Sequence, residues 1–203
     1  MWYDSAMVIG VWGDSITFGS CDEDALGWVG RLRKTLPHDD DHLLYNFGVC
    51  GETSEGLLKR FEIEASAVEP DITMFAIGIN DAMLPFASED PLVPIDAFRR
   101  NIETLLKQAA RYSHTIAFVG LTKVSDEWRT SYGNRYLHEV IEKYDNEIQR
   151  VATQHAVLYV PMSDVIDPHS DLADGLHPNA AGYEKMFERA RGILEAELLP
   201  KHL

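Results

Sequence analysis

The feature that most constrains the fold is a regular alternation of short apolar runs with longer helical patterns. Each run is mostly unbroken in apolarity and rich in Val, Ile, Phe or Tyr, as strands buried on both faces of a sheet are. The five runs are residues 6–12, 43–49, 71–78, 114–121 and 156–161. Five segments with apolar residues every three or four positions separate and follow these runs, and they predict amphipathic helices.

Such an alternation predicts right-handed crossovers and a parallel sheet that is covered on both faces by helices. We therefore expect a three-layer α/β/α fold whose five strands take the flavodoxin-like order 2-1-3-4-5. Asp24 and Thr53 are the expected caps of the first two helices, and Pro94 precedes the third. A chain of 203 residues fits one buried core, so we expect a single domain over residues 1–203.

Charge and hydropathy exclude several classes of partner. The 33 acidic and 18 basic residues give a formal charge of −15, which repels nucleic acid. No stretch approaches the roughly 20 apolar residues of a membrane span. The amino terminus lacks a basic start followed by an apolar stretch, so we expect a cytoplasmic protein. Cys21 and Cys50 are too few for a disulfide framework and are expected to be reduced thiols.

Three glycine-containing turns are predicted to meet at the carboxyl edge of the sheet, where folds of this kind bind ligands. They are residues 13–15, 48–51 and 78–81. Ser15 ends the first of them, directly after a buried strand. A serine held there on rigid backbone is a candidate nucleophile, although a plain turn also uses Gly, Asp and Ser.

A serine nucleophile needs a base, and the base needs an acceptor that orients it. The spacing Asp-x-x-His occurs twice, as Asp39 with His42 and as Asp174 with His177. The first pair precedes the second strand and therefore belongs to the opposite edge of the sheet. The second pair follows the last strand, so only Asp174 and His177 are expected to reach Ser15.

Acyl transfer to a serine also needs donors for the oxyanion of the transition state. The candidates are the backbone N–H groups of Ser15 and Gly51 and the side-chain amide of Asn80. The alternative for Asn80 is a cap of its own turn. The histidines show no spacing that indicates a metal site, and acyl transfer of this kind requires no cofactor.

Four short blocks in this order carry a resemblance to the GDSL-type esterases and lipases of the SGNH hydrolase superfamily. They are residues 13–16, 46–51, 78–81 and 174–178. The resemblance implies Ser15 as nucleophile, His177 as base, Asp174 as the orienting carboxylate, and Ser15, Gly51 and Asn80 as oxyanion donors. Ile16 replaces the usual Leu, and Cys50 precedes the oxyanion glycine, where a small polar residue is common. Asp14 is expected to stabilise its turn.

The expected substrate is a small-molecule acyl ester or thioester, and the lack of an obvious lid insertion favours short acyl chains. Leu84, Phe86 and Trp128 lie in segments expected to line the substrate pocket, unless they pack back on the core. The resemblance also allows carbohydrate deacetylases and lysophospholipases.

Two alternatives involve no catalysis. The hydroxyl-rich residues 15–20 are also typical of a phosphate loop in a flavodoxin-like flavin-binding module, a hypothesis that leaves Asp174, His177 and Asn80 unexplained. The other alternative is a protein that binds acylated ligands without turning them over.

Overall fold

A computed structural model of the protein describes residues 6–37, 41–125, 130 and 132–198. At its centre lies a sheet of five parallel strands in the order β2-β1-β3-β4-β5. The strands are β1 (Met7–Gly13), β2 (His42–Gly48), β3 (Ile72–Ala76), β4 (Thr115–Val119) and β5 (Leu158–Val160). The predicted strand order is therefore confirmed.

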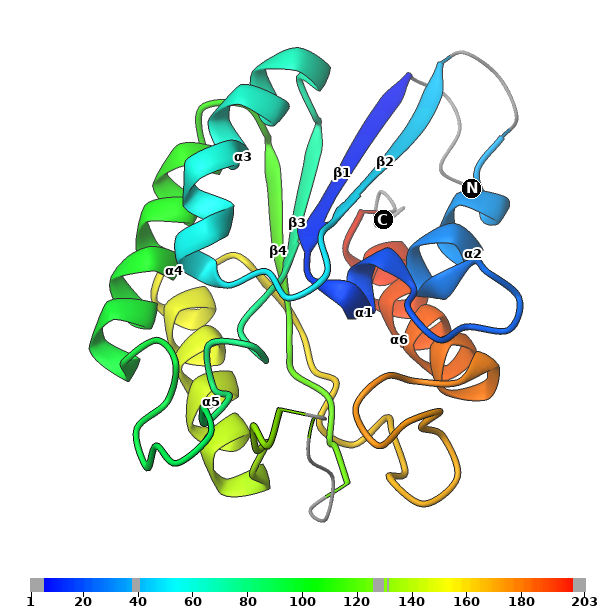
Figure 1. Cartoon of the computed structure of the whole chain (residues 1–203). Helices are drawn as coiled ribbons and strands as arrows, with labels where there is room; N and C mark the ends of the chain where they lie inside the picture. Colours follow the sequence, from blue (N-terminus) through cyan, green and yellow to red (C-terminus); the bar gives the residue numbers. More distant parts are fainter. Residues whose placement is uncertain (1–5, 38–40, 126–129, 131, 199–203) are drawn as a thin grey trace.

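Helices cover both faces of this sheet. Figure 1 shows α3, α4 and α5 on one side and α1, α2 and α6 on the other, which confirms the three-layer α/β/α prediction. The helices are α1 (Ser15–Phe18), α2 (Gly27–Thr35), α3 (Ser54–Val68), α4 (Ile95–Ala109), α5 (His138–Gln154) and α6 (Ala180–Leu198). Within the described ranges, no helix is long and apolar enough to cross a membrane.

The strand that precedes Ser15 is anchored by an aromatic cluster. Trp12 stacks on Phe47 of β2 with ring centroids 4.7 Å apart, and it meets Phe61 of α3 edge-on at 4.9 Å. Its indole N–H donates to Glu64 at 2.9 Å, so burial leaves no polar atom of this ring unsatisfied. Because β1 is the second strand of the sheet and its last five residues are buried, its carboxyl end is rigid.

Two local predictions differ from the structure. The helix α1, a single turn directly after β1, was not expected from the sequence. The prediction of Asp24 as the cap of the next helix was wrong, because Asp22 accepts the N–H groups of Leu26 and Gly27 at 3.1 and 2.7 Å. Thr53 caps α3 as predicted, through a bond from the N–H of Gly56.

Candidate active site

Ser15 begins α1 immediately beyond the carboxyl end of β1. Asp14 caps this turn as expected, since its Oδ1 accepts the N–H of Ile16 at 2.9 Å. Gly13 allows the close approach of β3, because a Cβ at this position would collide with the carbonyl oxygen of Ala76. The tight turn holds the Ser15 hydroxyl at the carboxyl edge of the sheet.

Three polar side chains form a continuous hydrogen-bonded chain at this edge. The Oγ of Ser15 lies 2.9 Å from Nε2 of His177, and Nδ1 of His177 lies 2.8 Å from Oδ2 of Asp174. The other carboxylate oxygen, Oδ1, accepts the backbone N–H groups of Leu176 and His177 at 2.9 and 2.8 Å. The loop before α6 therefore fixes the carboxylate and the imidazole together.

The charge of Asp174 determines which ring nitrogen of His177 carries the proton. Burial raises the pKa of the carboxyl, but the hydrogen bonds from the His177 ring and from backbone N–H groups outweigh it, so the pKa lies below its ordinary value. An ionised Asp174 accepts the proton on Nδ1 of His177. The lone pair of Nε2 then faces the Ser15 hydroxyl, which is the arrangement that general-base chemistry requires.

Of the first Asp-x-x-His pair, the structure describes only His42, and it places His42 far from Ser15 as predicted. His42 begins β2 and pairs in register with Met7, the first residue of β1, so it lies at the opposite end of the sheet from Ser15. Asp39 lies outside the described residues. His177, by contrast, hydrogen-bonds Ser15 across 162 positions of sequence.

The second block contributes an open backbone turn. Gly51 has a φ of 76°, and no described atom lies within 4 Å of the position that a Cβ would take there. Asn46 fastens the preceding strand end to α1, because its Nδ2 donates to the carbonyl of Thr17 at 2.9 Å while its Oδ1 accepts the N–H of Gly48. The turn at Gly51 thus has room beside it for a ligand.

The amide of Asn80 is held by two other loops. Its Nδ2 donates to the backbone carbonyl of Glu52 at 2.9 Å, and its Oδ1 accepts a hydrogen bond from the phenol of Tyr136 at 3.0 Å. These bonds lie outside its own turn, which argues against the turn-cap alternative. The sequence did not predict a role for Tyr136, because no pattern around it indicates contact with Asn80, which lies 56 positions earlier.

Two buried carboxyls lie beneath the site. Asp81 accepts the backbone N–H of Ser54, and it also accepts a hydrogen bond from the Ser54 hydroxyl, so it ties the start of α3 to the turn after β3. Burial raises the pKa of Asp81 to about 6, against the opposing bonds from Ser54. Burial also raises the pKa of Asp14 to about 7, and the nearby charge of Asp81 adds to this shift.

The predicted pocket residues occupy different environments. Leu84 is 2% exposed and pairs antiparallel with Arg135, so its side chain lies in the interior. Phe86 is 73% exposed, and its backbone N–H donates to Asn134 at 3.0 Å. Trp128 lies outside the described residues. Of the described two, only Phe86 presents a side chain to solvent.

The sequence model of the GDSL-like lipase/acylhydrolase family matches residues 11–185, the part of the chain that carries all four blocks. The chain belongs to this family. Two relatives align over 91% of the chain: a multidomain esterase of Ruminococcus flavefaciens at 28% identity and the esterase TesA of Pseudomonas aeruginosa at 25%. The aligned region makes up 28% of the multidomain esterase and 86% of TesA.

Solved structures show the same fold. A catalytic mutant of Axe2, an acetylxylan esterase from Geobacillus stearothermophilus, superposes with a TM-score of 0.77 at 20% identity, over 99% of this chain and 100% of that one. A structure of TesA gives a TM-score of 0.74 at 24% identity, over 95% and 99% of the two chains.

Membership of the GDSL-like family confirms the resemblance seen in the sequence and makes the protein a hydrolase of ester bonds. The flavin-binding alternative loses its basis. The hydroxyl-rich segment after β1 is not an open phosphate loop. It begins with a short helix, and the first residue of this helix, Ser15, hydrogen-bonds His177.

Proposed function

We propose that this protein is a serine esterase that hydrolyses short-chain acyl esters or thioesters through an acyl-enzyme on Ser15. The observation that supports it most is the hydrogen-bonded chain from Ser15 Oγ through His177 to Asp174, with separations of 2.9 and 2.8 Å. This chain has the geometry that activates a serine at neutral pH.

In the first half of the cycle, Ser15 Oγ attacks the acyl carbonyl while Nε2 of His177 takes the hydroxyl proton. The resulting oxyanion accepts hydrogen bonds from the backbone N–H groups of Ser15 and Gly51 and from the amide of Asn80. Asp174 stabilises the imidazolium that forms. The bond to the leaving group then breaks as His177 gives its proton to the departing alcohol or thiol.

In the second half, a water molecule attacks the acyl-enzyme and loses its proton to Nε2 of His177. Collapse of this second tetrahedral intermediate breaks the bond to Ser15, which regains the proton, and releases a carboxylic acid. Every proton is carried by His177, so the cycle needs no cofactor.

A carbohydrate deacetylase is the second candidate. The favouring observation is the match to the acetylxylan esterase Axe2, with a TM-score of 0.77 over 99% of the chain. Both candidates cleave a short acyl group, and they differ in the alcohol that leaves.

The test combines active-site labelling with a substrate panel. A fluorophosphonate probe should attach to Ser15, as identified by mass spectrometry, and the same adduct should form in Ser20→Ala, a matched control that removes the serine just beyond the end of α1. Labelling of another residue, or undiminished labelling of Ser15→Ala, would refute the assignment. Rates on p-nitrophenyl acetate, p-nitrophenyl octanoate, acetyl-CoA and acetylated xylo-oligosaccharides then identify the acyl and alcohol groups, and no turnover at all would favour ligand binding without catalysis.

A further inference from the structure

Cys21 lies beside the proposed catalytic residues, on the loop between α1 and α2. Its side chain is exposed, and its Sγ lies 3.8 Å from Oδ2 of Asp174. Nδ1 of His177 lies 2.8 Å from the same oxygen. A thiol, a carboxylate and an imidazole thus each place one potential metal ligand within 4.8 Å of the other two.

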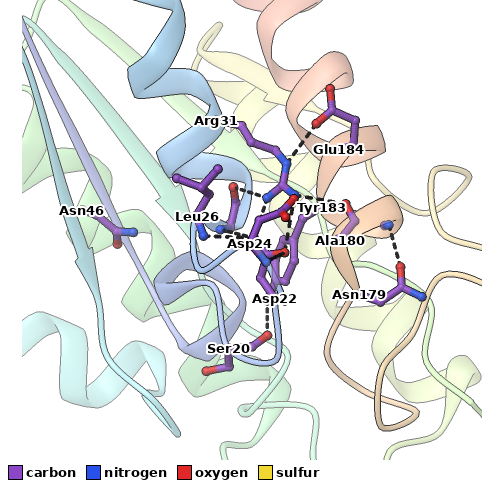
Figure 2. Close-up of polar contacts among 12 residues, drawn as sticks. Ser20, Asp22, Asp24, Leu26, Arg31, Asn46, Asn179, Ala180, Tyr183 and Glu184 are labelled. Carbon is purple, nitrogen blue, oxygen red and sulfur yellow. Dashed lines mark hydrogen bonds and ion pairs between the residues drawn. The ribbon is translucent and has the colours of Figure 1, made fainter.

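The loop that carries Cys21 is anchored on both sides (Figure 2). On one side, the phenol of Tyr183 donates to the backbone carbonyl of Ser20 at 2.8 Å. On the other side, the carboxylate of Asp22 forms a buried ion pair with Arg31, whose guanidinium also binds α6. The thiol is therefore held beside Asp174 without any rearrangement of the loop.

This set of ligand atoms suits a thiophilic cation. Zn²⁺ binds sulfur, nitrogen and carboxylate oxygen at about 2.0–2.3 Å, which places neighbouring ligand atoms roughly 3–4 Å apart. The separations of 2.8 and 3.8 Å around Asp174 Oδ2 are close to that range. Mg²⁺ and Ca²⁺ prefer oxygen ligands, so a set in which two of the three ligand atoms are sulfur and nitrogen does not suit them.

We propose that Cys21, Asp174 and His177 form a binding site for Zn²⁺ or a similar thiophilic divalent cation, and that its occupation inhibits the enzyme. The inhibition rests on the proposed function of Ser15 and His177, whereas the binding does not. The cation binds the Cys21 thiolate, whose proton passes to solvent, together with Asp174 Oδ2 and His177 Nδ1. A neutral imidazole bound through Nδ1 carries its proton on Nε2, so it cannot accept the proton of Ser15.

The protein is first treated with a chelator to remove metal and is then titrated with Cd²⁺, a spectroscopic substitute for Zn²⁺. Binding is followed by the ultraviolet charge-transfer band from thiolate to Cd²⁺. The band should form in wild type and in Cys50→Ser, the matched control that removes the other exposed thiol. It should be absent in Cys21→Ser. It should persist in Ser15→Ala, which keeps all three ligands, so metal binding is tested even if Ser15 is not the nucleophile.

Ester turnover is then measured against Zn²⁺ concentration, with each variant compared with its own metal-free rate. The inhibiting concentration should rise at least about 10-fold in Cys21→Ser, since even the indirect partners of metal ligands change affinity by 10–100-fold. Equal inhibition of Cys21→Ser and Cys50→Ser would overturn the proposal. A charge-transfer band without loss of turnover would also overturn it, because His177 would then be free.

Discussion

The phenol of Tyr136 donates a hydrogen bond to Oδ1 of Asn80 at 3.0 Å, on the side of the amide opposite to the bond from Nδ2 to the Glu52 carbonyl. A donor on one side and an acceptor on the other distinguish the amide oxygen from the nitrogen and fix the plane of the group. An amide nitrogen carries two N–H groups, and Glu52 uses one. The other is the N–H that we assign to the oxyanion.

Asn80→Ala tests that assignment directly. A donor to an oxyanion acts only in the transition state, so kcat should fall on the order of 10²- to 10³-fold with little change in KM. Thermal melting and ester kinetics on the same preparation check this. A protein that melts early but turns over normally would show that Asn80 is structural only.

Tyr136→Phe should lower kcat about 5-fold and leave KM nearly unchanged. The lost hydrogen bond is worth about 1 kcal/mol, and it acts on the reaction only through the orientation of Asn80. Tyr159→Phe is the matched control, because Tyr159 donates to the buried Asp145 at 2.8 Å outside the site. If both variants lower kcat equally, the effect of Tyr136 is one of general stability.

Asp174→Asn should fold but lose on the order of 10⁴-fold in kcat. The amide can stabilise the wrong tautomer of His177 and cannot balance the imidazolium charge. Asp164→Asn provides the comparison, since it removes an exposed carboxylate that pairs with Arg189 and should change kcat little. Steady-state kinetics of both variants test this prediction. Similar losses of kcat in the two variants would contradict the proposed role of Asp174.

The strand order and the meeting of Ser15 with His177 could be predicted because both follow from topology. Buried parallel strands can be recognised in the sequence as apolar runs, and the carboxyl ends of these strands lie at one edge of the sheet. The sequence could therefore distinguish Asp174 and His177 from the pair that precedes the second strand. The end of the sheet at which each pair lies was sufficient for this choice, and no knowledge of side-chain contacts was needed.

Contacts between loops could not be predicted in the same way. The bond from Tyr136 to Asn80 and the approach of Cys21 to Asp174 depend on side-chain directions in irregular segments, which have no periodicity to read. The wrong prediction of the cap at Asp24 has a related cause. The loop before α2 directs the carboxylate of Asp22, and not that of Asp24, to the N–H groups of Leu26 and Gly27, and spacing along the sequence does not give this direction.

Asp14→Asn should reduce the pH dependence of stability. The pKa of Asp14 is about 7 in the folded protein, above its ordinary value of 3.8. Between these values the folded state holds a proton that the unfolded state has lost, so stability falls as the pH rises from about 4 to 7. Asn caps a helix as well as Asp, so the variant should melt higher than wild type at pH 8.

Thermal melts from pH 5 to 8 check the Asp14 prediction. Asp81, with a pKa of about 6, keeps part of the slope in the variant. Parallel curves for wild type and Asp14→Asn would contradict the assignment of the slope to Asp14.

Asp22→Asn and Asp24→Asn should differ strongly in stability, although both residues contact Arg31. The Asp22 side chain is fully buried and that of Asp24 is 60% exposed. Removing one partner of a buried ion pair costs about 3 kcal/mol or more, whereas an exposed pair contributes about 1 kcal/mol at most. Urea unfolding of the two variants measures the difference in the free energy of unfolding. Equal losses would show that Asp22 contributes as a surface charge does, and the loop that carries Cys21 would then lack the anchor that we assign to it.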